Sequence, residues 1–307
     1  MKALLKATSL AAILLLAFLV IIPSCKKEKS ELTQEEAEQF GQATAESDAE
    51  AEATYDDVFD NVMGVNAEVG IGGTGIFGQR NTQYGDEIIS GANGTDTVPP
   101  CVTITITRLN PPAAFPVRVV MDFGSGCTGR DGRLRKGKII TVYTGRLVAP
   151  GSVAETTFDG YYVNGVHVEG VHRIQNKSTS QQWIFEVTVR NGKLTRPNGN
   201  YSQWNSTKTI TQIEGSGTPL FPLDDIFSIK GESGGTVKRD SLLFQWSART
   251  LPDNPLIKRF TCRWIVKGKI AIRRTNSDVA VIDYGAGLCD NKATITINGV
   301  VHEITLH

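Results

Sequence analysis

The pattern that decides the fold is Val119-Val120-Met121-Asp122-Phe123-Gly124-Ser125-Gly126-Cys127, which returns as Ala280-Val281-Ile282-Asp283-Tyr284-Gly285-Ala286-Gly287-Leu288-Cys289. In each stretch, an apolar strand leads into an aspartate, an aromatic residue, two glycines and a cysteine. Because glycine permits the backbone angles of a sharp reversal, each stretch predicts a strand that ends in a tight turn. The repetition predicts two related β-units within residues 101–307.

The N-terminus has the features of an export signal. Lys2 and Lys6 give a basic start, and the apolar run of residues 10–22 is shorter than a membrane-spanning helix. Residues 1–24 and the cysteine that follows, Cys25, resemble the signal of bacterial lipoproteins. The resemblance implies removal of the signal and attachment of fatty acid, including palmitate, at Cys25. The alternative is an uncleaved membrane anchor, and both interpretations place the rest of the chain outside the cytoplasm.

The four remaining cysteines form two pairs with nearly equal spacing. Cys101 lies 26 residues before Cys127, and Cys262 lies 27 residues before Cys289. An even number of cysteines in an exported protein favours disulfides, and no two of them have the two-residue spacing of a zinc site. Four cysteines allow three pairings. The repeat favours Cys101 with Cys127 and Cys262 with Cys289.

Charge is distributed unevenly along the chain. Residues 26–68 contain 13 acidic and 3 basic residues, a net charge of −10, whereas residues 69–307 contain 27 basic and 19 acidic residues, a net charge of +8. The sequence therefore predicts an acidic arm before a mildly basic body. No nucleic-acid-binding motif accompanies this charge, so nucleic acid is not an expected partner.

The acidic arm divides into three predicted segments. Residues 25–46 are polar and are predicted to be a lipidated flexible tether. Residues 47–64 are predicted to form an amphipathic helix, because a capping-box spacing at Ser47 and Glu50 precedes a helical apolar period. That period consists of Ala51, Tyr55, Val58, Phe59 and Val62. Residues 65–100 are rich in glycine and are predicted to be a linker.

From Cys101 onward the hydrophobic pattern has a period of two. Three dipeptides that suit type I′ hairpins, Asn164-Gly165, Asn191-Gly192 and Asn298-Gly299, lie between the alternating runs. Residues 101–307 are therefore predicted to be an all-β domain, mainly an antiparallel meander of about a dozen strands. A large twisted sheet, a sandwich and an open barrel all fit, with the N-terminal amphipathic helix covering an apolar face.

The C-terminal unit carries a wider resemblance. Its Asp-aromatic-Gly turn ends in Cys289-Asp290-Asn291-Lys292-Ala293 and is followed by the Asn298-Gly299 hairpin. This arrangement resembles a group of all-β lipoproteins of Gram-negative envelopes that has no established activity. The resemblance implies a location and a fold but no mechanism. Lys26, directly after Cys25, is similar to lipoproteins that are sorted to the outer membrane.

One stretch suggests catalysis. Gly231-Glu232-Ser233-Gly234-Gly235 is similar to the nucleophile loop of chymotrypsin-like serine proteases and also has the spacing of an esterase elbow. The histidine motif of the proteases is missing, because His167 and His172 lie within predicted strands. A glycine-serine hairpin loop is the simpler interpretation, and no catalytic residue is predicted.

A basic cluster and three aromatic residues are the candidate binding residues. The candidate anion-binding residues are Arg130, Arg133, Arg135, Lys136 and Lys138. They suit lipopolysaccharide, an acidic glycan or the protein's own acidic arm; the alternative is a solvated hairpin that protects an edge strand.

Trp204, Tyr161 and Tyr162 are candidates for stacking on sugar rings, against the alternative that they pack within the sheet. The histidines do not form a metal-ligand pattern, and aspartates beside glycines are ordinary turn chemistry. No metal or cofactor is therefore predicted.

These observations favour a non-catalytic lipoprotein at the outer membrane that displays an all-β binding or structural module. Its expected partners are the membrane, through the lipid on Cys25, and a glycan, lipid or envelope protein. One alternative is a carrier that encloses an apolar or lipid ligand between the curved sheet and the helix. Another is a serine hydrolase that uses Ser233.

Overall fold

A computed structural model describes residues 33–66, 68–70, 79–80, 88–89, 101–129, 131–216, 224–274 and 277–306. The chain divides at residue 35, and residues 36–307 form the unit that carries the fold. The predicted signal peptide, the lipidation site Cys25 and most of the predicted linker lie outside the described residues.

Strands make up most of the described chain. The main sheet contains β3 (Thr103–Arg108), β4 (Val117–Asp122), β5 (Cys127–Thr128), β6 (Leu134–Tyr143), β7 (Val153–Val163), β8 (Val166–Asn176), β9 (Ile184–Thr195), β10 (Tyr201–Glu214), β11 (Ile226–Arg239), β12 (Leu242–Thr250), β13 (Leu256–Arg259), β14 (Ile265–Arg274), β15 (Ser277–Ala286), β16 (Lys292–Ile297) and β17 (Val300–Thr305). A separate small sheet pairs β1 (Gln79–Arg80) with β2 (Ile88–Ile89). In the part of the chain that the structure describes, one helix, α2 (Gln34–Gly64), precedes them.

The main sheet is a single antiparallel meander of 15 strands. Its order is β17-β16-β15-β14-β12-β11-β10-β9-β8-β7-β6-β4-β3, with β5 beside β6 and β13 between β11 and β14. Strands β12 and β13 pair with different segments of the same two neighbours, so together they fill one position in the sheet. The predicted all-β class with one N-terminal helix is confirmed, and among the three architectures considered it is the single large sheet that forms.

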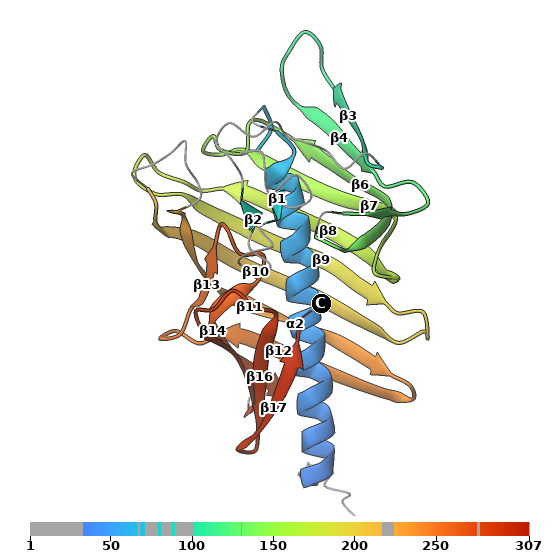
Figure 1. The fold of residues 1–307 in the computed structure, drawn as a ribbon, viewed down its shortest axis with the longest axis vertical. Helices are drawn as coiled ribbons and strands as arrows, with labels where there is room; N and C mark the ends of the chain where they lie inside the picture. Colours follow the sequence, from blue (N-terminus) through green and yellow to red (C-terminus); the bar gives the residue numbers. More distant parts are fainter. Residues whose placement is uncertain are drawn as a thin grey trace, which may run out of the picture. The chain divides into compact units, whose positions relative to one another are not determined.

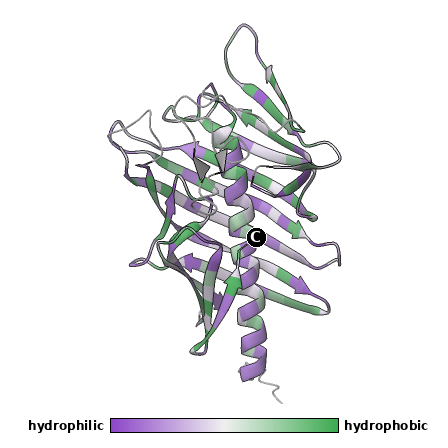
Figure 2. Cartoon of the chain, in the orientation of Figure 1, coloured by the Kyte–Doolittle hydropathy of each residue, from purple (hydrophilic) through white to green (hydrophobic). Residues whose placement is uncertain are grey.

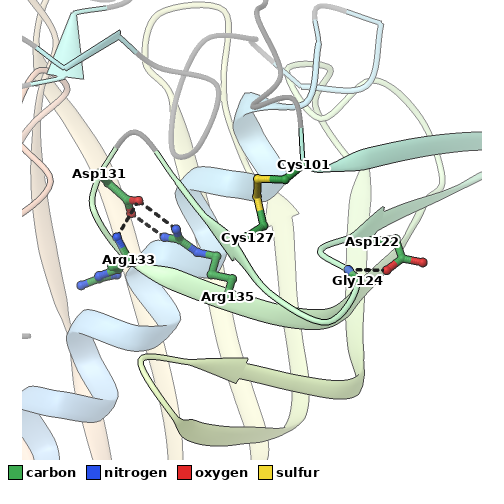
Figure 3. Close-up of a disulfide and its surroundings, with 7 residues drawn as sticks. All are labelled: Cys101, Asp122, Gly124, Cys127, Asp131, Arg133 and Arg135. Carbon is green, nitrogen blue, oxygen red and sulfur yellow. Dashed lines mark hydrogen bonds and ion pairs between the residues drawn. A yellow bond between two sulfur atoms is a disulfide. The ribbon is translucent and has the colours of Figure 1, made fainter.

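The predicted pairing of the cysteines is confirmed. Cys101 is bonded to Cys127, with Cα atoms 5.5 Å apart, and Cys262 is bonded to Cys289, with Cα atoms 5.8 Å apart. Figure 3 shows the first disulfide joining the start of β3 to β5. Each bond therefore closes a unit that contains one copy of the repeated strand and turn.

The repeated turns also share their local hydrogen bond. The backbone N–H of Gly124 donates to Asp122 Oδ1 at 2.8 Å, and that of Gly285 donates to Asp283 Oδ1 at 2.9 Å. The aromatic residue between them is buried in both copies. Aspartate thus closes each turn and the aromatic ring fastens it to the core, which explains why the two stretches share their sequence pattern.

Two of the three predicted hairpins are confirmed and one is wrong. Asn164-Gly165 joins β7 to β8, Asn298-Gly299 joins β16 to β17, and all four residues have positive φ. Asn191-Gly192 instead lies inside β9, where the register with both neighbouring strands shifts. A positive φ suits a β-bulge as well as a turn, so the dipeptide bends a continuing strand there.

Helix α2 is longer than predicted. It begins at Gln34 rather than Ser47, so the assignment of residues 34–46 to a flexible tether is wrong. The physical reason is tertiary: Phe40, Ala43 and Ala45 are buried, and this packing favours a helix where local polarity alone indicated none. Ser47 is not a helix cap but a buried residue whose Oγ hydrogen-bonds to Ser202 Oγ at 2.6 Å.

The helix lies across one face of the sheet, as Figure 1 shows. Of its predicted apolar residues, Ala51, Tyr55, Val58 and Val62 are buried, and Phe59 is half-buried. The strands present alternate residues to the helix, which is why Figure 2 shows hydrophobic and hydrophilic residues alternating along them. We call the face under α2 the inner face and the opposite one the outer face.

Candidate functional site

The inner face holds α2 through charge as well as apolar packing. The ion pairs between the helix and arginine or lysine residues of the body are Glu46 with Arg239, Glu50 with Arg196, Glu52 with Lys208, Asp56 and Asp60 with Lys258, and Asp57 with both Arg133 and Arg135. We call this set the charge clamp. The acidic arm predicted from the sequence is therefore bound, along this helix, by basic side chains of the body.

Arg135 is the most buried residue of the charge clamp. The guanidinium of Arg135 is fully buried and contacts both Asp57 and Asp131, at 2.7 Å and 2.6 Å. Burial of Asp57 opposes its ionisation, but the adjacent Arg135 and Arg133 outweigh that cost and hold its pKa below the usual value. Figure 3 shows the Arg135 guanidinium turned toward Asp131, which also accepts a hydrogen bond from the backbone N–H of Arg133 at 3.2 Å.

The basic cluster is therefore not a continuous anion-binding surface. For Arg133 and Arg135, which are buried under the acidic helix, the structure shows the alternative in which the cluster binds the protein's own acidic arm. Lys138 on β6 pairs with Asp122 on the neighbouring strand β4 at 3.6 Å. Lys136 is exposed, and its Nζ lies 4.0 Å from the centre of the Tyr162 ring. Arg130 lies outside the described residues. The helix provides the anions for two members of the cluster.

Two of the three candidate sugar-stacking residues are also buried. Trp204 is 2% exposed and Tyr161 is 1% exposed, so the stacking interpretation is wrong for both. The Trp204 ring is parallel to the Tyr55 ring of α2, with centroids 5.3 Å apart. Tyr162 faces the other side of its strand, is half-buried, and stacks on His167 at 4.5 Å. Packing against α2 explains the burial of Trp204, because its strand lies beneath the helix.

Ser233 belongs to the contact between helix and sheet. It lies within β11, so the predicted hairpin loop is wrong. Its Oγ donates to Asp48 Oδ1 at 2.7 Å, and Trp204 Nε1 donates to the same oxygen at 2.8 Å. The glycines beside Ser233 allow close strand pairing, since a Cβ on Gly235 would collide with the carbonyl oxygen of Gln203.

His167 and His172 do not form a catalytic pair with Ser233. His172 on β8 is three strands away from β11, a separation of about 14 Å at the usual strand spacing. It is fully buried, and burial lowers its pKa from 6.5 to about 3. His167 faces Glu169 and Tyr162 on another part of β8. Ser233 therefore has a carboxylate partner, but neither of these imidazoles is within reach as a base.

The outer face carries an open hollow of about 660 Å³. Its first row consists of register partners on β8 to β12, namely Arg173, Thr188, Thr207, Glu232 and Arg249. Its second row, on β10 to β14, consists of Asn205, Gly234, Ser247 and Arg273. Arg190 on β9 also lines it. We call this hollow the outer groove. Ser206, Ser233 and Ala248 also border the groove, but their side chains point to the inner side of the sheet, where Ser206 and Ala248 are buried and Ser233 contacts Asp48 of the helix.

Three arginines of the outer groove, Arg173, Arg190 and Arg249, have exposed or neutral partners, and Arg273 pairs with Asp278 at 3.0 Å. Arg190 Nη2 is 3.3 Å from Glu155 Oε2, and Arg249 Nη2 is 3.2 Å from Asp278 Oδ2, with all four side chains at least 40% exposed. Arg173 Nη2 donates to the neutral Gln175 Oε1 at 3.0 Å. Exposed ion pairs of this kind stabilise a fold by about 0–1 kcal/mol. These guanidinium groups can therefore exchange partners at little cost.

The described residues contain neither a membrane-spanning helix nor a metal site. Where the structure is described, no helix has both the length and the apolar character needed to cross a membrane. Within those residues, too, no three histidine, cysteine or acidic side chains are arranged to hold a metal ion. Asp122 and Asp283, the aspartates of the repeat, are occupied with closing their own turns.

Comparisons with known proteins do not assign the chain to a family. No family model matches it, and no curated protein or solved structure is similar to it. Function is therefore inferred from what the two faces of the sheet offer. Helix α2 crosses the inner face, and the outer face carries the groove.

The outer groove was not predicted from the sequence. Its arginines lie on four strands, and residues 173 and 273 are 100 positions apart. Each arginine lies at an outward position of an alternating run, and this is the only feature of the local sequence that indicates its place on the outer face. Strand order brings them together, and alternation alone does not reveal that order.

Proposed function

We propose that this protein is a lipoprotein of the outer membrane, attached through fatty acid on Cys25, whose sheet is a non-catalytic binding module. The observation that supports a binding module is the contrast between the two faces. Helix α2 covers the inner face and neutralises its basic residues, whereas the outer face keeps an open, arginine-lined groove. In this proposal the helix stiffens the sheet, and the outer face meets the partner.

The lipid-carrier alternative receives less support. A carrier needs an apolar cavity of several hundred Å³. The outer groove has the volume, but arginine, threonine, asparagine and serine side chains line it. On the inner face, α2 itself packs against the apolar side chains that such a cavity would use.

Attachment through Cys25 is tested by the Cys25→Ser variant of the full-length chain. We expect the wild-type protein to sediment with outer membranes and to carry an acyl-chain mass on its N-terminal peptide. The variant is expected to lose both properties. Ser24→Ala is the matched control, because it changes the neighbouring residue and keeps the cysteine. Retention of the acyl mass in Cys25→Ser would overturn the proposed anchor.

The non-catalytic character is tested separately with a serine-reactive phosphonate. We expect no labelling of the folded wild-type chain, because Ser233 Oγ is hydrogen-bonded to Asp48 beneath the helix and His172 lies three strands away. Labelling that disappears in Ser233→Ala would contradict the proposal and support the hydrolase alternative.

A further inference from the structure

We infer that the outer groove binds an acidic oligosaccharide, with its arginines on the acidic groups and its hydroxyl and amide side chains on the sugar hydroxyls. This inference rests on the proposed function and names the class of ligand that the binding module takes. It concerns the residues of the outer groove, none of which is among the candidate anion-binding and sugar-stacking residues of the sequence.

The length of the groove indicates an oligomer rather than a single ion. Arg173 and Arg249 stand at the two ends of one row of register partners, four strand positions apart. At the usual strand spacing this is about 19 Å. One phosphate or carboxylate cannot contact both arginines, whereas a chain of several sugar units can.

The floor between these arginines carries several polar side chains, and Val189 and Ala248 also line the groove. Thr188, Thr207, Asn205 and Ser247 supply hydroxyl and amide groups that both donate and accept hydrogen bonds. Adjacent strands repeat these groups at about 4.8 Å, close to the length of one sugar unit. Gly234 has no side chain, so the groove is deeper at its middle.

The charges of the groove require acidic groups on the ligand. Arg173, Arg190, Arg249 and Arg273 all line it, and Glu232 is the acidic residue in the same lining. A guanidinium has five N–H donors in a planar fork and binds carboxylate or sulfate oxygens through two of them at once. Arg190 has one exposed contact, to Glu155, and Asp278 contacts both Arg249 and Arg273; exposed contacts of this kind can be replaced by an acidic ligand.

The lining favours a saccharide over a protein partner. Protein interfaces are usually centred on aromatic or other large apolar residues in desolvated pockets. The residues that line the outer groove include no aromatic side chain. A hydroxyl-rich chain can replace its hydrogen bonds to water with hydrogen bonds to such a surface, whereas an apolar peptide segment cannot.

The test is a binding titration of the full-length chain in detergent with oligogalacturonate, a uronic acid oligomer. We expect saturable binding that is at least about tenfold weaker in the double variant Arg190→Gln/Arg249→Gln, since each change removes a charge-assisted hydrogen bond. The matched control is Arg108→Gln/Arg118→Gln, which removes two exposed arginines at the other end of the same sheet. We expect the control to bind like the wild-type protein, and thermal unfolding confirms that both variants are folded.

Three results would overturn the inference. The first is equal binding of neutral dextran oligomers, which would show that the acidic groups are not recognised. The second is equal or tighter binding of poly-glutamate, which would show that any polyanion suffices. The third is equal loss in the control and groove variants, which would place the interaction outside the groove. None of these results depends on Cys25, so they are distinguishable from a failure of the proposed anchor.

Discussion

Arg135 Nη2 lies 2.7 Å from Asp57 Oδ1, although 78 residues separate the two in the sequence. The contact joins α2 to β6 at a point where the arginine side chain is fully buried. Because Asp131 binds the same guanidinium, one side chain holds the helix and the turn before β6 together. The contact thereby fixes where α2 lies on the inner face.

The first prediction concerns this contact. We expect Arg135→Met to lower the free energy of unfolding by about 3 kcal/mol or more, because it leaves buried carboxylates without their main partner. Urea denaturation at neutral pH measures the change. The control is Lys292→Gln, which breaks an exposed pair with Glu303 and is expected to leave the free energy of unfolding almost unchanged. Equal losses in the two variants would show that the buried contact has no special role.

The second prediction concerns pH. Burial lowers the pKa of His172 from its ordinary value of 6.5 to about 3 in the folded protein, so below pH 6.5 the unfolded chain binds more protons. The stabilisation from neutral His172 is fully present above pH 6.5 and is lost as the pH falls toward 3. From pH 6.5 to pH 5, we expect a loss of roughly 2 kcal/mol, since one pKa unit corresponds to about 1.4 kcal/mol.

Two carboxylates, Asp60 and Asp57, also contribute to the pH dependence of the free energy of unfolding. Burial raises the pKa of Asp60 to about 6, with Lys258 opposing the rise, so its contribution becomes more favourable as the pH falls through 6. Asp57 has a lowered pKa and acts in the same direction as His172, but at lower pH. Urea denaturation of His172→Gln and Asp60→Asn at pH 7.5 and 5 separates the effects. An unchanged pH dependence in His172→Gln would contradict the assignment.

The third prediction concerns the disulfides. We expect removal of either pair, by Cys101→Ser/Cys127→Ser or by Cys262→Ser/Cys289→Ser, to lower the free energy of unfolding by about 3 kcal/mol, since the two closed loops have similar lengths. Chemical denaturation measures the loss, and peptide mapping without reduction checks the pairing. A crossed disulfide between the two units in the wild-type protein would contradict the structure.

The fourth prediction concerns a glycine that the sheet requires. Gly137 has a φ of +78°, and a Cβ there would collide with the carbonyl oxygen of Gly160 on the neighbouring strand. We expect Gly137→Ala to destabilise the protein by roughly 2 kcal/mol or more, through strain and displaced strands. In Gly126→Ala, the new Cβ would meet only a Leu134 methyl at 3.5 Å, an ordinary contact, so that variant is the control. Thermal melts of both variants measure the difference. Similar melting temperatures would show that Gly137 and Gly160 do not approach each other closely.

Local features could be predicted from the sequence because they depend on neighbouring residues. Side-chain alternation fixed the all-β class, and the Asn-Gly pairs at 164–165 and 298–299 specified hairpins. The disulfide pairing followed from a repeat that keeps each bond within one unit. Asn191-Gly192 shows the limit, because its backbone preference fits a bulge and a hairpin equally well.

Only the tertiary structure decided what each face of the sheet does. Arg135, Trp204 and Ser233 are polar or amphipathic residues that local pattern cannot distinguish from surface residues, and the acidic helix buries all or part of each one. The outer groove depends on strand order, which brings Arg173 and Arg249 to the ends of one row. The sequence by itself determined the strands, turns and crosslinks, because these follow from backbone preferences over a few residues. The positions of the helix and the groove arginines required the assembled sheet, because charge pairing and burial act across space between residues far apart in the chain.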